Sequence, residues 1–177
     1  GESELAEKSF RRALSEDADY TRGRVYYGAF LFAQGRMAEA RDQFQAASED
    51  TEYDDLGSVF FNLGMTQERL GALDQAAAAY RRSVELSREA RALLALSRVL
   101  VAQGQFEAAS RYYSRLTTII QRNPRMTHSA ESLLTGIQIA RHFNDRDQEA
   151  SLALLLKNEY PGSAEYQQYK VLISNDQ

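Results

Sequence analysis

The chain has 177 residues, of which 44% are hydrophobic and 26% are charged, and this balance is typical of a folded globular or solenoid protein. Its net charge of −4 comes from charges of both signs mixed along the chain, which argues against nucleic acid as the main partner. The absence of cysteine excludes disulfides, zinc-thiolate sites and thiol nucleophiles, and no apolar run approaches the roughly 18 residues of a membrane span.

The first predicted element is a lone helix over residues 3–15, which carries Ala6 and, four residues later, Phe10. No helix precedes it that could pair with it. Because the chain begins with Gly1 and not with a methionine, and no signal peptide is present, we expect the natural protein to continue upstream. The missing helix would leave Phe10 and Leu14 partly uncovered unless they pack forward onto the next helices.

Two further helices are predicted over residues 20–34 and 36–48. Gly28 lies in the middle of the first one, where a glycine lowers helix stability by up to about 1 kcal/mol relative to alanine. The second helix carries Ala40 with Phe44 four residues later, as in the lone helix. Something in the fold must therefore compensate for a small residue at position 28.

The next pair of helices, over residues 56–70 and 72–86, repeats the pattern with Gly64, Ala76 and Tyr80. We expect the two helices of a pair to cross closely at the two small residues, with the aromatic ring filling the space beside the crossing. The packing gained there would offset the helix propensity lost at the glycine.

A second set of glycines ends the first helix of each pair: Gly35, Gly71 and Gly104. They follow the small register residue by seven positions in each case. Glycine permits the left-handed backbone with which a helix often ends, so we predict a tight turn at each of them.

The third pair is predicted over residues 89–103 and 105–121. Its register residues are Ser97, Ala109 and Tyr113. The segment "QRNPRMT" that follows is expected to be a loop, because Pro124 pushes Asn123 away from helical geometry.

The fourth pair is predicted over residues 128–143 and 146–159. Its register residues are Gly136, Ala150 and Leu154. Since Gly136 and Ala150 are 14 residues apart, against 12 in the other pairs, the turn around Asn144 should be longer. A short last helix over 163–173, with Ser163 as its N-cap, should close the array.

The spacing of these positions identifies the repeat. Ala6, Ala40, Ala76 and Ala109 follow one another at intervals of 34, 36 and 33 residues. This matches the tetratricopeptide repeat, with a small residue in the first helix and A-x3-F in the second. The predicted fold is therefore all-α: one array over residues 1–177, a right-handed superhelical solenoid of antiparallel helix pairs.

The sequence offers little chemistry. His128 and His142 lie 14 residues apart without further ligands around them, and the Asp54-Asp55 pair lies at a helix start, where aspartate is favoured as a cap. No glycine-rich loop follows a strand, so phosphate cradles and nucleophile elbows are not expected. We predict a protein that is not an enzyme and needs no metal or cofactor.

Three segments carry more than a general repeat pattern. They are "YGAFLFAQGRMAEARDQFQAASED" at 27–50, "SLLTGIQIARHFNDRD" at 132–147 and "LALLLKNEYPGSAEYQQY" at 152–169. In this order they resemble the type IV pilus biogenesis/stability lipoproteins of the PilF/PilW family, over essentially the whole chain. The F-L-F-x-Q-G-R run, the A-S-E-D sequence and the Y-P-G-S ending are its most specific parts.

The resemblance implies a lipoprotein on the periplasmic side of the bacterial outer membrane that acts as a pilotin. Such proteins help the pilus secretin to reach the outer membrane and to assemble its ring. Expected partners are the secretin and other pilus assembly proteins, with membrane contact only through an N-terminal lipid. The signal peptide, the acylated cysteine and the first one and a half repeats of that family are not in this sequence, so no role of theirs is carried over.

In arrays of this kind, positions two, five, nine and twelve of each first helix face the concave groove. An apolar stripe occupies such positions here: Val25, Phe32, Phe61, Met65, Leu94, Val101, Leu133 and Ile137. We predict that this stripe binds an apolar or amphipathic segment of a partner, with the secretin as the family-implied candidate. The alternative is that neighbouring helices or the C-terminal helix cover several of these residues, because apolar stripes at helical spacing are often core.

A generic scaffold or co-chaperone that binds a peptide in its groove is the alternative function. A chaperone clamp needs Lys and Asn at positions five and nine of adjacent repeats. These positions hold Val25/Ala29, Phe61/Met65, Leu94/Arg98 and Leu133/Ile137, so a carboxylate clamp is disfavoured.

Overall fold

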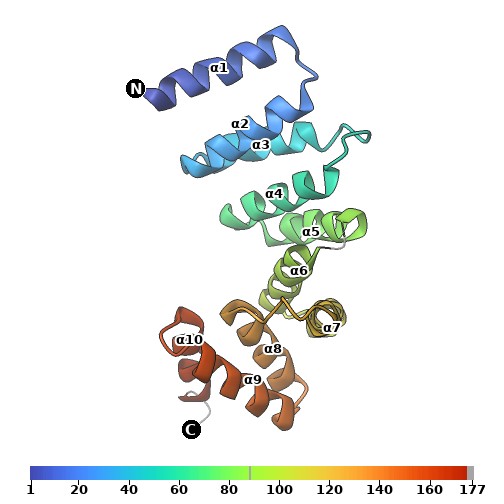
Figure 1. Ribbon diagram of the computed structural model, residues 1–177, viewed down its shortest axis with the longest axis vertical. Coiled ribbons are helices and arrows are strands. Elements are labelled where there is room, and N and C mark those ends of the chain that lie inside the picture. Colours follow the sequence, from blue (N-terminus) through green and yellow to red (C-terminus); the bar gives the residue numbers. More distant parts are fainter. Residues whose placement is uncertain (88, 175–177) are drawn as a thin grey trace. The chain divides into compact units, whose positions relative to one another are not determined.

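The computed structural model describes residues 1–87 and 89–174, and these form ten α-helices (Figure 1). No strand occurs among them, so the all-α prediction is confirmed. The chain divides into two compact units, an N-terminal unit Gly1–Ala92 and a C-terminal unit Leu93–Gln177. A single array over residues 1–177 therefore stays a prediction.

The helices of the N-terminal unit follow the predicted lone helix and two pairs. They are α1 (Glu2–Glu16), α2 (Thr21–Ala33), α3 (Met37–Ala47), α4 (Leu56–Arg69) and α5 (Leu73–Ser87). Within this unit α2 packs on α3, α3 on α4, and α4 on α5, so that first helices (A) and second helices (B) alternate (Figure 1).

Helix α6 begins in the N-terminal unit and continues into the C-terminal unit, which further contains two B helices, one A helix and a last single helix. The helices are α6 (Ala90–Ala102), α7 (Phe106–Arg122), α8 (Ala130–His142), α9 (Arg146–Glu159) and α10 (Ala164–Ser174). Every helix of the chain begins and ends within two residues of its predicted range.

The small residues lie at close helix crossings. A Cβ atom on Gly28 would lie 2.8 Å from the ring of Phe44, and one on Gly64 would lie 2.7 Å from the ring of Tyr80. Ala76, on the opposite side of the second crossing, is 0% exposed. The aromatic rings thus fill the space that a side chain on helix A would need, which explains why glycine is tolerated inside these helices.

The turns between helices A and B share one geometry. Gly35, Gly71 and Gly104 adopt φ angles of 75°, 76° and 71°, and Asn144 adopts 55°. In each turn the next residue donates its N–H to the carbonyl five positions back, at 2.8–2.9 Å, as Asp145 does to Ala140. The fourth turn is therefore no longer than the others, and the prediction of a longer turn there is wrong.

Aligning the repeats on these turns corrects the register of the fourth pair by one residue. Ile137, and not Gly136, occupies the place of Gly28 and Gly64, and Ala153 occupies the place of the aromatic residue; both are buried. The large side chain has moved from helix B to helix A at this crossing. Ala150 and Leu154 are consequently exposed, Leu154 by 58%, and they are not the buried register residues that the sequence predicted.

Gly136 itself faces the preceding repeat. A Cβ atom there would lie 2.3 Å from Tyr113 Oη and 2.9 Å from Leu152 Cδ1. A small residue is thus required at position 136 because of Tyr113 on α7, for a reason different from the one that applies at Gly64.

The two ends of the chain are packed as single helices. On α1, the half-buried Phe10 stacks on Tyr27 with ring centroids 5.4 Å apart, so this helix packs forward onto α2. At the other end, Ser163 Oγ accepts the N–H of Tyr166 at 3.1 Å and caps α10. Asn123 is extended, with φ −119° and ψ 102°, and ends α7 before Pro124.

Candidate functional site

The predicted stripe divides into two groups. Six of its residues are half-buried and border solvent: Val25, Phe32, Phe61, Met65, Leu94 and Val101. Leu133 and Ile137 are 1% and 0% exposed and belong to the core beneath α10, where Tyr166 and Tyr169 pack against them. Their assignment to an open groove is therefore wrong, and for these two the alternative of a covered position holds.

The one-residue shift explains this error. With Ile137 as the register residue, positions two, five, nine and twelve of α8 are Glu131, Leu134, Gln138 and Arg141. The helix A face of this repeat is thus far more polar than the sequence suggested. The signal that would have found these residues is the Asn144-Asp145 turn, because asparagine adopts left-handed backbone more readily than most residues.

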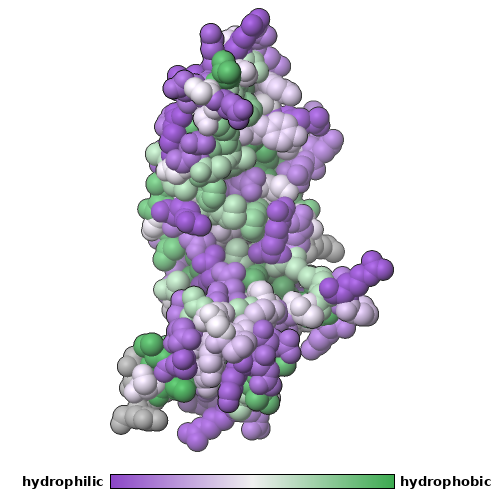
Figure 2. All heavy atoms as spheres, turned by 60° about the vertical axis from the view of Figure 1, so that its left-hand side comes forward, coloured by the Kyte–Doolittle hydropathy of each residue, from purple (hydrophilic) through white to green (hydrophobic). Residues whose placement is uncertain are grey.

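In the N-terminal unit, three half-buried side chains on the A helices form a surface that we call the aromatic face: Phe32, Phe61 and Met65. The Phe61 ring lies 5.7 Å from the Tyr80 ring, so the crossing at Gly64 supports it from below. Figure 2 shows apolar side chains reaching the surface of this unit among charged ones. Val25 and Phe32 also pack against the core of this unit, Val25 beside Val59 and Ala47.

Arginines border the aromatic face. The guanidinium carbon of Arg91 lies 4.6 Å from the centroid of the Phe61 ring, and that of Arg69 lies 5.9 Å from the centroid of the Phe32 ring. Arg91 also donates to Ser58 Oγ at 2.9 Å. Each cation–π contact of this kind stabilises the packing of the arginine on the ring by about 0.5–1 kcal/mol at an exposed site.

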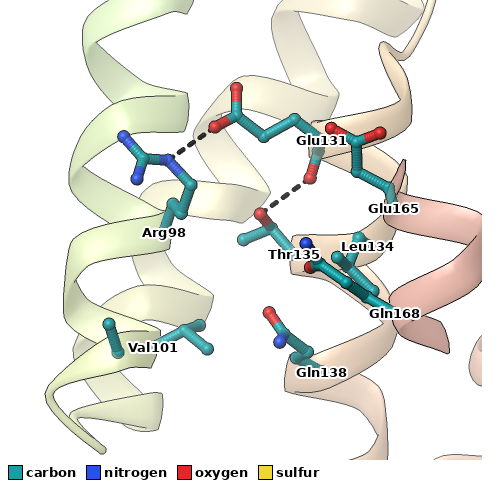
Figure 3. A pocket seen from close by; sticks show the side chains of 9 residues that line it. Arg98, Val101, Glu131, Leu134, Thr135, Gln138, Glu165 and Gln168 are labelled. Carbon is teal, nitrogen blue, oxygen red and sulfur yellow. Dashed lines mark hydrogen bonds and ion pairs between the residues drawn. The ribbon is translucent and has the colours of Figure 1, made fainter. Parts of the chain in front are cut away.

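In the C-terminal unit, a cavity of about 320 Å³ lies between α6, α8 and α10 (Figure 3). Three of the corrected groove positions of α8 line it: Glu131, Leu134 and Gln138. Arg98 and Glu131 lie at one end, where Arg98 Nε is 2.6 Å from Glu131 Oε1. Glu165, from the first turn of α10, lies beside Glu131. The sequence did not indicate Glu165, because only tertiary packing brings α10 against α8.

The remaining walls of this cavity are amides and aliphatic side chains. Gln138 and Gln168 face it from α8 and α10, and Val101 and Leu134 contribute aliphatic side chains from α6 and α8 (Figure 3). The hydroxyl of Thr135 donates a hydrogen bond to the carbonyl of Glu131 at 2.8 Å, within α8 itself. The cavity therefore offers carboxylates, amide oxygens and some aliphatic surface.

The histidines are packing residues. His128 Nδ1 lies 2.8 Å from Ser132 Oγ, and burial lowers the pKa of His128. The His142 ring stacks on Phe106 with centroids 3.9 Å apart. Among residues 1–87 and 89–174, no group of three His, Cys, Asp or Glu side chains could hold a metal ion. None of the helices in these ranges is long and apolar enough to cross a bilayer.

Comparison with known sequences agrees with the repeats. Tetratricopeptide-repeat profiles match residues 21–89 and 90–123. The type IV pilus assembly protein PilF of Pseudomonas aeruginosa is 35% identical over 170 residues, or 96% of this chain. The chain spans 65% of the length of that relative.

Solved structures give the same picture. The Pseudomonas aeruginosa PilF structure superimposes with a TM-score of 0.83 at 34% identity, covering 95% of this chain and 73% of that one. PilW, a widely conserved type IV pilus biogenesis factor, superimposes with a TM-score of 0.74 at 26% identity, covering 93% and 73%. The tetratricopeptide-repeat protein YrrB, at 19% identity and a TM-score of 0.78 over 96% and 84%, shares the fold.

Proposed function

Because the chain belongs to the PilF/PilW family of tetratricopeptide-repeat proteins of type IV pilus assembly, a family of non-enzymatic assembly proteins, we propose that it works as a pilotin. In this role it holds a segment of the outer-membrane secretin while the secretin ring assembles. Other pilus assembly proteins are further candidate partners. The family resemblance supports a place on the periplasmic side of the outer membrane, with a lipid anchor upstream of the present residues.

The observation that carries the proposal is the aromatic face. Phe32, Phe61 and Met65 are only half-buried although they are among the larger apolar side chains of the N-terminal unit. Covering the area that these three side chains still expose contributes on the order of 1–3 kcal/mol. Association opposes this with about 4–15 kcal/mol, so polar and backbone contacts of a longer segment must add to it. A moderate affinity follows, which suits an assembly factor that releases its client.

The co-chaperone alternative gains no support from the corrected register. A carboxylate clamp would need Lys and Asn at positions five and nine of adjacent repeats. In the fourth repeat these positions are Leu134 and Gln138, and the other three repeats also lack the pair.

The proposal is tested by the double substitution Phe61→Glu with Met65→Glu. We expect it to reduce co-purification with the secretin and calorimetric binding at least tenfold, because two apolar anchors become charged. Leu86→Glu is the matched control, since Leu86 is 46% exposed on α5, a B helix. Both variants must keep the helical melting curve of the parent. Undiminished secretin binding by the double variant would contradict a site on the aromatic face.

A further inference from the structure

We propose that the cavity between α6, α8 and α10 binds a cationic side chain, lysine or arginine, of the segment that this protein holds. The inference rests on the proposed function, since it adds a charge requirement to the recognition of that segment. It concerns residues that lie together in the C-terminal unit, and the aromatic face does not contribute to it.

The charges around the cavity favour a cation. The lining includes two carboxylates, those of Glu131 and Glu165, and one guanidinium, that of Arg98. Arg98 and Glu131 form an ion pair in which the two side chains are 34% and 45% exposed. Glu165 forms no ion pair with any residue that the structure describes, so the lining carries a net charge of −1. An ammonium or guanidinium group beside Glu165 would neutralise it.

The other walls suit the rest of such a side chain. Amide oxygens of Gln138 and Gln168 can accept hydrogen bonds from the cationic head, which has several donors and no acceptor (Figure 3). Val101 and Leu134 offer apolar surface to the aliphatic stem, which lysine and arginine commonly bury along such surface. The volume of about 320 Å³ lies at the lower end of small-ligand sites, as expected for one long side chain.

The cavity and the aromatic face differ in the sign of the charged side chains that border them. Arg69 and Arg91 border the aromatic face, whereas a carboxylate without an ion pair borders the cavity. A purely apolar segment would satisfy the first surface and leave Glu165 without a partner. A lysine or arginine in the bound segment therefore provides selectivity that the apolar contacts cannot give.

Glu165 also has a structural role, because it lies in the first turn of α10, where an acidic residue stabilises a helix. The experiment must separate this role from ligand binding. Glu107 provides the control: it is an exposed acidic residue in the first turn of α7 and does not line the cavity. Glu107→Lys and Glu165→Lys change the net charge and the helix terminus in the same way.

The test measures retention of the 177-residue chain on five immobilised 12-residue peptide mixtures that differ only in the central residue: Lys, Arg, Gln, Leu or Glu. We expect the Lys or Arg mixtures to retain roughly three- to tenfold more protein than the Gln and Leu mixtures, and the Glu mixture to retain least. Glu165→Lys should abolish this preference and Glu165→Gln should weaken it, while Glu107→Lys should keep it. The ratio of the Lys and Arg signals shows which cation the cavity prefers.

Equal retention on the Lys and Glu mixtures would overturn the proposal, and so would an unchanged preference in both Glu165 variants. Loss of the preference in Glu107→Lys would attribute it to net charge and would overturn the proposal as well. The proposed function fails separately, through undiminished secretin binding by the Phe61→Glu, Met65→Glu variant. A chain that loses secretin binding in that variant but shows no preference among the peptide mixtures keeps the proposed function and lacks the cation site.

Discussion

The Tyr80 ring fills the space above Gly64, so that a Cβ atom added at position 64 would lie 2.7 Å from ring atoms Cδ1 and Cε1. This distance is shorter than side chains in proteins tolerate without movement. Tyr80 is 0% exposed and cannot swing outward without opening the core. The glycine and the tyrosine therefore depend on each other across the α4–α5 crossing.

We expect Gly64→Leu to lower the free energy of unfolding by several times the ~1 kcal/mol that helix propensity could change. Urea denaturation followed by circular dichroism measures the effect. Ala38→Leu, on the exposed side of α3, adds bulk without a crossing and should shift the free energy by less than about 0.5 kcal/mol. If Gly64→Leu unfolds at the same urea concentration as the parent, the helices do not cross closely there.

The turn at Asn144 gives a second prediction. A β-branched side chain is strained at its φ of 55°, so Asn144→Val should destabilise the protein by about 1–2 kcal/mol. Asn144→Gly should stay within about 0.5 kcal/mol of the parent, because glycine adopts this backbone freely. Equal stabilities of the Val and Gly variants in urea titrations would show that the left-handed turn does not form.

At the crossing of the fourth repeat, the large side chain, Ile137, lies on helix A and the small one, Ala153, lies on helix B. Substitutions at these two positions should therefore be coupled. Ala153→Phe overpacks the space beside Ile137 and should lower the free energy of unfolding by about 1–3 kcal/mol, and Ile137→Gly leaves a cavity and should lower it by about 2–5 kcal/mol. The double variant restores the arrangement of the other repeats. A double-mutant cycle in urea should therefore show a favourable coupling of about 0.5–3 kcal/mol. Strictly additive losses would mean that the two side chains do not share one space.

A network of charged and polar side chains connects α1 to the first helix pair, α2 and α3. Glu7 accepts hydrogen bonds from Tyr27 Oη at 3.0 Å, from Arg11 at 2.6 Å and from Arg36 at 2.8 Å. The hydrogen bond from Arg36, above all, holds the pKa of Glu7 below its usual value, against the opposing effect of desolvation. Since the pKa is lower in the folded state, the stability gained is present above the unfolded-state pKa of Glu7 and is lost as pH falls through the folded-state value.

We therefore expect Glu7→Gln to lower the melting temperature at neutral pH, with the difference from the parent shrinking as the medium is acidified through the pKa of Glu7. Thermal melts recorded between pH 7 and about pH 3 measure this, since an ordinary glutamate titrates near 4.3. Glu16→Gln is the control, because the exposed Glu16 pairs along α1 with Arg12. A difference that stays constant over this range would exclude ionised Glu7 as its cause.

The helices and three of the four turns could be predicted from the sequence because glycine at a fixed spacing signals both a crossing and a left-handed turn. The fourth turn was predicted to be too long because asparagine takes the place of glycine at position 144, and Gly136 then gave a register one residue off. That single shift placed the buried Leu133 and Ile137 on the groove in place of Leu134 and Gln138. A helix turns by about 100° per residue, so such an error assigns a different face of the helix to the groove.

The cavity could not be predicted, since two of its walls depend on where α10 packs. Glu165 and Gln168 belong to a helix with no repeat partner, and no spacing rule relates them to Arg98 or Glu131. The docking of α10 depends on Tyr166 and Tyr169 meeting the core formed by Leu133 and Ile137. Contacts of this kind come from tertiary packing and leave no periodic pattern.

The exchange of large and small side chains at the fourth crossing also restricts how the gene can change. Repeat proteins commonly gain and lose units by recombination between similar segments. Here a hybrid that joins an earlier helix A, with Gly28 or Gly64, to α9 would place glycine opposite Ala153 and leave a hole. The reverse hybrid would drive Ile137 into an aromatic ring. The exchange at Ile137 and Ala153 ties α8 to α9, and the close approach of Gly136 to Tyr113 ties α8 to α7, so only an exchange of these three helices together would keep both contacts.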